Sequence, residues 1–345
     1  MPGPRALIRG RAPLRVSFCG GGTDVDPYPA DRGGCVLSAT IDKYAYASLA
    51  GREDQELNIR SLDYDVVAKY KVNTALVYDG ELDLVKAVVR AAGTLPGGLD
   101  LFLHADAPPG SGLGSSSTMV VATLGALWRW LGREHSAYEL AEQAYRIERG
   151  DLGIRGGQQD QYAAVFGGFN FMEFTAEGVV VHPLRLEPNL INELHYRLLL
   201  VYTGRRRLSA RIIERQVDGY LQGSPQVVSA LDTLKALTLA MKNALLQERL
   251  DTFAALLHEA WEAKKGLAPG VTDEAIDELY AVARGLGASG GKILGAGGGG
   301  YLLLCCPFRS RPDIACGLEQ LGGQVVPFAF SPKGLECWTV RSGSQ

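Results

Sequence analysis

The hydrophobic and polar positions along the first 70 residues predict a curled β-sheet. Short runs rich in β-branched and aromatic residues, separated by glycine and charged positions, are typical of strands. The expected strands cover residues 15–19, 35–49, 57–61 and 64–71.

Between residues 80 and 190 the pattern changes to a mixture of helices and strands. The helix that begins near residue 136 has a defined start, because Ser136 and Glu139 match a capping box. A glycine-rich turn precedes the most apolar helix. The expected helices are 81–92, 115–131 and 136–149, and the expected strands are 99–104, 168–174 and 179–186.

The remainder of the chain is dominated by helical periodicity. The expected helices are 210–220, 225–247, 251–264 and 273–284, and the expected strands are 196–201, 300–306, 324–330 and 337–341. A chain of 345 residues exceeds the size at which one core usually stops growing, so two lobes sharing a cleft are expected. We therefore predict an α+β fold with an N-terminal lobe over residues 1–190 and a C-terminal lobe over residues 191–345.

Composition and charge narrow the class of ligand. The formal net charge is -3 and the basic residues are dispersed, so the basic patch of a nucleic-acid binder is missing. The N-terminus lacks the apolar run of a signal peptide, and no stretch approaches the length of a membrane-spanning helix. The six cysteines show no CxxC spacing. We expect a cytoplasmic protein with a small-molecule ligand and no nucleic-acid or membrane partner.

Glycine is over-represented, with 43 residues in 345, against a usual share of about 7%. The most informative cluster lies between an expected strand and an expected helix, in the segment Pro108 to Ser117, which reads PPGSGLGSSS. Glycines at 110, 112 and 114 leave backbone amides unobstructed, and a helix N-terminus attracts anions. The segment predicts a phosphate-binding loop, although an isolated Gly-Ser turn with a serine cap has similar composition.

Other phosphate and nucleophile motifs do not fit. Lys292 follows Gly291, but Leu286 and Ile293 stand where a Walker A loop needs glycine and Ser or Thr. The HRD and DFG segments of protein kinases are missing. The segment 287–291 matches a GxSxG elbow, but no histidine follows it, as a hydrolase triad in that order requires.

Three motifs in the right order resemble the galactokinase, homoserine kinase, mevalonate kinase and phosphomevalonate kinase family, the GHMP kinases. They are the loop Pro108 to Ser117, the segment APLRVSFCGGGTD at 12–24 and the segment KILGAGGGGY at 292–301. The resemblance implies a ribosomal protein S5 domain 2-like N-terminal lobe, a ferredoxin-like C-terminal lobe, and ATP with Mg²⁺. It also implies ATP contacts from Pro109, Gly110, Ser111, Gly112, Leu113, Gly114, Ser115, Ser116 and Ser117.

Finer resemblance points to one branch of the family. The runs GGGTDVDPYP, GGCVLSATIDKYAY and LHEAWEAKKGL are similar to kinases that phosphorylate D-glycero-D-manno-heptose 7-phosphate at C1, a step toward GDP-heptose for bacterial surface polysaccharide. Gly21 and Gly22 replace the acidic and histidine pair of galactokinases, which argues against galactose. A fucokinase-like sugar kinase and a non-catalytic sugar and ATP sensor are alternatives, and a homodimer is possible.

The resemblance also implies roles for four polar residues. Ser116 and Glu148 would bind Mg²⁺, with Ser115 and Ser117 capping the helix. Asp160 would take or orient the proton of the acceptor hydroxyl, and Arg15 would face that hydroxyl and stabilise developing charge. Each residue also has a purely structural alternative. Ser116 could cap the helix and Glu148 could form a surface ion pair, while Asp160 could be an ordinary residue at a helix N-terminus and Arg15 a surface arginine at a strand end.

Substrate binding is expected at three further places. The resemblance implies that Gly22, Thr23 and Asp24 contact the sugar, although Asp24 also suits an Asx turn. Gly298 and Gly299 belong to the third motif and join this expected set. A substrate phosphate needs its own anion site. We expect that site at one of two basic clusters, Arg205 with Arg206 or Lys264 with Lys265, unless these are solvated basic faces.

Overall fold

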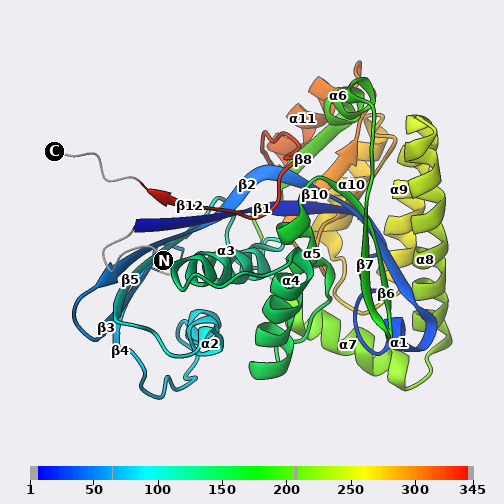
Figure 1. Ribbon diagram of the computed structural model, residues 1–345. Coiled ribbons are helices and arrows are strands. Elements are labelled where there is room, and N and C mark those ends of the chain that lie inside the picture. The colour runs from blue at the N-terminus through cyan, green and yellow to red at the C-terminus, as the bar shows by residue number, and fades with distance from the viewer. Residues whose placement is uncertain (1–6, 64, 206–208, 341–345) are drawn as a thin grey trace.

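The computed structural model describes residues 7–63, 65–205 and 209–340. Within this part, two β-sheets carry helices on their faces (Figure 1). The larger sheet contains β1 (Leu7–Cys19), β2 (Gly34–Arg52), β3 (Glu56–Ser61), β4 (Val66–Lys71), β5 (Gly98–Ala105), β6 (Phe169–Thr175), β7 (Gly178–Pro183) and β12 (Glu336–Val340). The smaller sheet contains β8 (Leu198–Tyr202), β9 (Gly290–Ile293), β10 (Tyr301–Cys305) and β11 (Gln324–Val325).

Helices make up the rest of the regular structure. The early helices are α1 (Tyr28–Arg32), α2 (Asp83–Ala92), α3 (Ser115–Trp130), α4 (Ala137–Arg146), the π-helical turn η1 (Ile147–Asp151) and α5 (Gln159–Phe166). The later helices are α6 (Pro188–Arg197), α7 (Ser209–Leu221), α8 (Pro225–Leu246), α9 (Leu250–Lys265), α10 (Glu274–Gly285) and α11 (Arg311–Gln320). The predicted α+β class is confirmed.

The larger sheet is built around two long strands. Its order is β12-β1-β2-β5-β3-β4, and β6 pairs with a different part of β2 and with β7. β2 pairs with β5 through residues 45–52 and with β6 through residues 34–39. β1 and β2 therefore extend across the molecule (Figure 1), and the predicted division into lobes at residue 190 stays a prediction.

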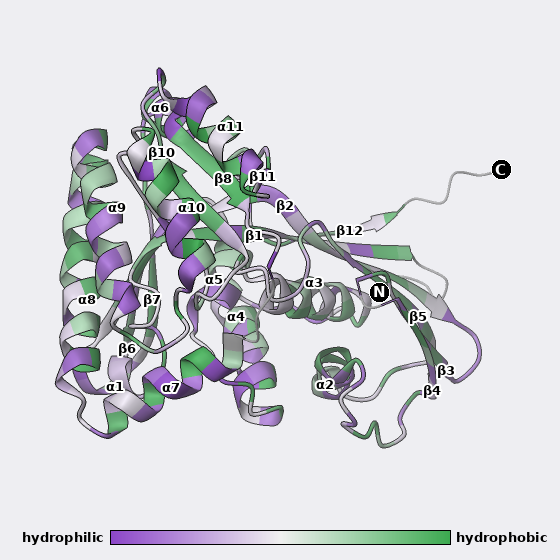
Figure 2. Ribbon diagram, turned by 180° about the vertical axis from the view of Figure 1, so that it is seen from behind, coloured by the Kyte–Doolittle hydropathy of each residue, from purple (hydrophilic) through white to green (hydrophobic). Residues whose placement is uncertain are grey.

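The smaller sheet has the order β11-β8-β10-β9, and each pair of neighbours is antiparallel. In chain order this is a β-α-β-β-α-β arrangement with the first and third strands in the centre, which is the ferredoxin-like pattern expected for the C-terminal lobe. β8 and β10 consist mainly of hydrophobic residues (Figure 2), and Leu302, Leu303 and Leu304 of β10 are fully buried. The long helices α8 and α9 pack against each other beside this sheet (Figure 1).

Helix α3 is the central helix of the N-terminal part. It packs on β1 and β2, and 13 of its 16 residues are buried. Gly10 of β1 makes this packing close, because a Cβ atom there would lie 2.4 Å from the carbonyl oxygen of Ala122. The amide of Arg15 in β1 also donates to the carbonyl of Leu113 at 3.1 Å, so the loop that leads into α3 is held beside β1.

Several elements differ from those predicted. The helix expected to reach Arg149 ends as α-helix at Arg146 and continues as the π-turn η1. The strand expected over 324–330 is paired for two residues only, after which Phe330 makes a single bridge to Ile41. Helices α6 and α11 were not expected. The last strand, β12, lies beside β1 in the larger sheet, although it comes from the end of the chain.

Candidate active site

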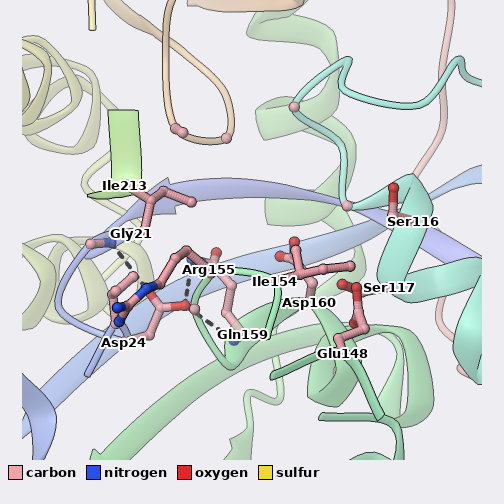
Figure 3. A pocket seen from close by; sticks show the side chains of 18 of the residues that line it. Gly21, Asp24, Ser116, Ser117, Glu148, Ile154, Arg155, Gln159, Asp160 and Ile213 are labelled. Atoms are coloured by element: carbon pink, nitrogen blue, oxygen red, sulfur yellow. Dashed lines mark hydrogen bonds between the residues drawn. The ribbon is translucent and has the colours of Figure 1, made fainter. Parts of the chain in front are cut away.

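A cleft lies where the glycine-rich segments meet, with about 910 Å³ of empty space when the part open to solvent is included. It is lined by the loop before α3, the ends of β1 and η1, the segment 154–160, and residues of α7 and α9. Figure 3 shows Ser116, Ser117 and Glu148 at one end of this pocket, Gly21, Asp24, Arg155 and Ile213 at the other, and Asp160 between them. We call these the Glu148 end and the Asp24 end of the pocket.

The loop at residues 108–117 has the conformation that its glycines permit. Gly110, Gly112 and Gly114 have φ angles of 75°, 89° and 79°, which side-chain-bearing residues rarely adopt. Gly114 is the N-cap of α3 and no side chain caps the helix. The expected capping by Ser115 and Ser117 is wrong, because Ser115 donates to the Pro108 carbonyl and Ser117 accepts from Gln161. An uncapped helix N-terminus beside a glycine loop can bind an anion.

The third glycine-rich motif supports this loop from behind. A Cβ atom on Gly112 would lie 2.6 Å from the Leu294 carbonyl oxygen, and one on Gly295 would lie 2.6 Å from the Cα atom of Gly112. The amide of Tyr301 donates to the carbonyl of Ser111 at 3.1 Å. The two motifs are therefore in main-chain contact, which only glycine permits.

Not every residue of the predicted ATP segment reaches the pocket. Gly110, Gly112, Gly114 and the three serines line it, whereas Pro109 does not. Ser111 and Leu113 are buried behind the loop.

Arg15 and Asp160 form an ion pair in the middle of the pocket. The Nε and Nη2 atoms of Arg15 lie 2.7 and 2.6 Å from Oδ1 of Asp160. The Nη1 atom donates to the Gly112 carbonyl at 2.5 Å. Asp160 stands in the first turn of α5, and its Oδ2 would lie 3.3 Å from a Cβ atom on Gly114. The pair therefore joins the β1 end, the phosphate loop and α5.

Glu148 is buried at the opposite end from Asp24. Its side chain is 2% exposed and lies in the π-turn η1, and the amide of Gln161 donates to both Glu148 and Ser117. Burial raises the pKa of Glu148, and Arg149, 3.7 Å away, opposes this shift. The alternative of a surface carboxylate is wrong. π-turns often occur at functional sites.

The Glu148 end fits a magnesium ion held partly by ligand phosphates. Mg²⁺ is usually bound by one or two carboxylates together with substrate phosphates, not by an all-protein cage. No cluster of three His, Cys, Asp or Glu residues suited to a metal is found in residues 7–63, 65–205 and 209–340. The buried Glu148 carboxylate, with Ser116 on the same side of the pocket (Figure 3), supplies the oxygen donors that such an ion needs.

Asp24 holds the other end of the pocket together. Its Oδ1 accepts from the Gly22 amide at 2.9 Å, and its Oδ2 accepts from the amide and side chain of Gln159 at 3.1 and 3.0 Å. A Cβ atom on Gly157 would lie 2.0 Å from Oδ2. Asp24 is 1% exposed. Its carboxylate therefore joins its own loop to the segment 157–159, and contact with a sugar stays a prediction.

Thr23 does not face the pocket. It is fully buried, and its hydroxyl donates toward the carbonyls of Gly20 and Cys35 and accepts from the Cys35 amide. Gly22 does line the pocket, and its carbonyl accepts from Gln216 of α7 at 2.9 Å. Of the two neighbours, Thr23 positions the loop and Gly22 lines the pocket, where contact with a sugar stays a prediction.

The basic residues expected to bind a substrate phosphate are distributed differently. Arg205 is half-exposed, pairs with Asp273 at 3.2 Å and lies outside the pocket. Arg206 lies outside the described residues. Lys265 pairs with Glu262 at 2.9 Å, also outside the pocket. Of this group, Lys264 is the residue that the described structure places in the pocket lining.

Gly298 and Gly299 are not brought into the pocket either. The Gly298 amide donates to the Val271 carbonyl at 2.8 Å. A Cβ atom on Gly299 would lie 3.0 Å from the Arg205 carbonyl oxygen. Their neighbours Gly295 and Ala296 line the pocket instead.

Two lysines at the pocket are buried, Lys264 in its lining and Lys292 outside it. Lys264 donates to the carbonyls of Gly295 and Ile293, and Lys292 donates to the Ser17 carbonyl at 2.9 Å. Burial lowers the pKa of Lys264 well below its usual range, and burial lowers the pKa of Lys292 to about 8. Arg15 adds to both shifts and Asp24 opposes them.

Several pocket residues were missed by the sequence interpretation. Gln159 and Gln161 flank Asp160 in the chain. Gln159 donates to Asp24 and Gln161 donates to Glu148. In the sequence, only their position beside Asp160 in the run QQDQ indicates a role in the site. Gln216 and Arg155 come from segments without a recognisable motif. None of the described helices is long and apolar enough to cross a membrane.

Comparison with known proteins agrees with this geometry. The model for the GHMP kinases N terminal domain matches residues 80–168, and the model for the GHMP kinases C terminal domain matches residues 241–321. The first segment contains the phosphate loop, Glu148 and Asp160, and the second contains the third glycine motif.

Relatives of known name cover nearly the whole chain. A D-glycero-alpha-D-manno-heptose 7-phosphate kinase of Campylobacter jejuni is 37% identical over 96% of this chain and 99% of its own length. The crystal structure of a D-glycero-D-manno-heptose 1-phosphate kinase from Bacteroides thetaiotaomicron has a TM-score of 0.82 and 35% identity, over 97% of this chain and 100% of that one. An L-fucokinase/L-fucose-1-P guanylyltransferase of Bacteroides fragilis is 28% identical over 96% of this chain and 38% of its own length. The chain therefore belongs to the GHMP kinases and is a sugar kinase of that family.

Proposed function

We propose that this kinase transfers the γ-phosphoryl group of ATP to the anomeric C1 hydroxyl of D-glycero-D-manno-heptose 7-phosphate, giving the 1,7-bisphosphate. The observation that carries the proposal is the Arg15–Asp160 ion pair, which stands between the uncapped N-terminus of α3 and the Asp24 end. Phosphoryl transfer needs a positioned hydroxyl and charge stabilisation, and little covalent chemistry from the protein.

The donor would lie along the phosphate loop. GHMP kinases use ATP, and the amides at the start of α3 would bind its phosphates. Ser116 and Glu148 would hold Mg²⁺, which when bound neutralises phosphate charge. The pocket thereby directs the γ-phosphoryl group toward Asp160.

The acceptor would lie between Asp160 and Asp24. Oδ1 of Asp160 is taken by Arg15, so Oδ2 is the atom available to accept the proton of the C1 hydroxyl. The sugar oxygen then forms a bond to the γ-phosphorus while the bond to the leaving oxygen of ADP breaks. Arg15, beside both Asp160 and the phosphate loop, would stabilise the negative charge that develops.

The identity of the sugar rests on the relatives. The Campylobacter jejuni protein is named a heptose 7-phosphate kinase and the Bacteroides thetaiotaomicron protein a heptose 1-phosphate kinase. We choose the 7-phosphate as substrate, and we place the reaction in the cytoplasm, in the supply of GDP-heptose for bacterial surface polysaccharide. A fucokinase-like activity on an unphosphorylated sugar is the second candidate, favoured by the Bacteroides fragilis relative.

The product distinguishes these assignments. The full-length protein is incubated with ATP, Mg²⁺ and D-glycero-D-manno-heptose 7-phosphate, and the product is examined by ³¹P nuclear magnetic resonance. The proposal predicts a second phosphorus signal coupled to the anomeric proton. A new phosphate coupled to any other sugar proton, or no new phosphate, contradicts it. Light scattering on the same protein decides between a monomer and a homodimer.

A further inference from the structure

The cations that line the pocket are mostly engaged already. Arg15 bonds to Asp160 and Gly112, and Lys264 donates to two main-chain carbonyls. Arg149 donates to the carbonyls of Ile154 and Gly157 and lies 3.7 Å from Glu148. These three side chains hold the site together. The Nε atom of Arg149 has no partner but is buried, so it is not accessible to a ligand.

Arg155 differs from the other pocket cations. It is exposed, lines the pocket, and makes no hydrogen bond or ion pair with any residue in the described part of the chain. Glu214 and Asp218 of α7 share a neighbouring hollow with it, but neither forms an ion pair with it. Its guanidinium is therefore available to a ligand.

The position of Arg155 matches the far side of a bound sugar. Figure 3 shows Arg155 with Gly21, Asp24 and Ile213, at the end of the pocket away from Ser116 and Glu148. The reacting hydroxyl must face Asp160, so the opposite carbons of the sugar extend toward this end. A phosphate on the last carbon of the sugar therefore falls on the side of Arg155.

The local chemistry suits a phosphate. An arginine fork binds phosphate oxygens bidentately, and charge-assisted bonds of this kind are stronger than neutral ones. Gly156 and Gly157, which follow Arg155, also line the pocket. Their backbone amides donate to no acceptor in the part of the protein that the structure describes. A guanidinium and two adjacent amides form an anion site of a familiar kind.

We propose that Arg155 binds the phosphate that the sugar substrate already carries and thereby selects sugar phosphates over free sugars. This inference rests on the proposed function. Arg155 thus takes the place of the two basic clusters that the sequence suggested as the phosphate site. Arg205 and Lys265 form ion pairs outside the pocket, and Lys264, which lines the pocket, donates to main-chain carbonyls.

Binding without turnover tests the proposal most cleanly. Isothermal titration calorimetry compares D-glycero-D-manno-heptose 7-phosphate with unphosphorylated D-glycero-D-manno-heptose, in the absence of ATP. The wild-type protein should bind the phosphorylated sugar more tightly. Arg155→Ala should weaken that binding by roughly 10- to 150-fold, the size of a lost bond to a charged group, and leave binding of the free sugar unchanged. Arg155→Lys should recover part of the loss.

Two control variants make the outcome specific. Arg185→Ala removes an exposed arginine outside the pocket and should leave both affinities unchanged. Glu214→Gln tests whether Arg155 acts by contacting α7; if it reproduced the Arg155→Ala phenotype, the proposal would be overturned. Retained preference for the phosphorylated sugar in Arg155→Ala would also overturn it, while leaving the proposed function intact. If the wild-type protein shows no preference, the proposed substrate is wrong and the inference fails with it.

Discussion

A Cβ atom on Gly112 would lie 2.6 Å from the carbonyl oxygen of Leu294, so the phosphate loop and the third glycine motif touch through their main chains. We predict that Gly112→Ala displaces the loop. The added methyl group would clash with the Leu294 carbonyl oxygen. The φ angle of Gly112 is also 89°, and a left-handed backbone costs a non-glycine residue about 1 to 3 kcal/mol. Turnover should fall by roughly 100-fold if the loop moves by about 1 Å.

Gly285→Ala is the matched control for this variant. Gly285 ends α10, and a Cβ atom there meets no other atom within 4 Å. Urea denaturation should show a lower midpoint for Gly112→Ala and an unchanged or higher one for Gly285→Ala. Equal midpoints in the two variants would show that the contact with Leu294 is unimportant.

Asp160→Asn should abolish most of the turnover while leaving nucleotide binding in place. An asparagine keeps the shape of the side chain but cannot take the hydroxyl proton, and a positioned acid or base contributes about 10²- to 10⁴-fold. Steady-state ADP release gives kcat, and titration with a fluorescent ATP analogue gives the affinity. Asp313→Asn, at an exposed position of α11, serves as the control. Full turnover in Asp160→Asn would remove Asp160 from the mechanism.

Glu148→Gln should raise the Mg²⁺ concentration needed for half-maximal activity. The amide keeps the size of the side chain but lacks the charge that a hard cation requires. We expect a shift of roughly 10- to 100-fold, which even residues that only support metal ligands produce. An unchanged Mg²⁺ dependence would assign Glu148 to structure alone.

The Mg²⁺ requirement should also depend on pH. Burial raises the pKa of Glu148, so more of the carboxyl is protonated in mildly acidic solution than is usual for glutamate. Since a metal ligand must be deprotonated, apparent Mg²⁺ affinity in the presence of ATP should rise as the pH increases from 5 to 7. This dependence should be weaker in Glu148→Gln.

Lys292 should make stability depend on pH in alkaline solution. Its pKa is about 8 in the folded protein, because of burial, and about 10.4 when unfolded. Between these values the unfolded chain binds more protons, so the free energy of unfolding rises with pH. The destabilisation of the folded protein by the buried charge of Lys292 is fully present below about pH 8 and is lost as the pH approaches 10.

Lys292→Met removes this titration. Urea denaturation at pH 7 and at pH 10 should show the wild-type protein gaining stability relative to Lys292→Met as the pH rises. Lys69→Met, at an exposed position of β4, should show no such change. A constant difference between wild type and Lys292→Met would mean that Lys292 is not held with a lowered pKa.

Local sequence chemistry predicted the elements that depend on local interactions. The capping box at Ser136 and Glu139 is present with both of its hydrogen bonds. The end of this helix was not predicted correctly, because nothing in the sequence indicates the π-turn η1 that contains Glu148. The pairing of β12 with β1 joins the two ends of the chain and likewise has no local signal.

The site was predictable only where a motif marked it. The glycine loop, Asp160 and Glu148 stand in or near segments that resemble a family, and the structure brings all of them to one pocket. The motif at 12–24 also marked Arg15, but its ion pair with Asp160 joins residues 145 apart in the chain and has no local signal. Arg155 has no motif at all, and its importance becomes visible only when the engaged and free cations of the pocket are compared.

We propose that the Arg15–Asp160 pair serves a heptose phosphate acceptor. The most direct test is steady-state ADP release by the wild-type protein with D-glycero-D-manno-heptose 7-phosphate, mannose 6-phosphate and L-fucose, each with ATP and Mg²⁺. We expect the highest kcat/KM for the heptose phosphate, with little turnover of the other two sugars. A higher kcat/KM for L-fucose, or equal values for all three, would contradict it.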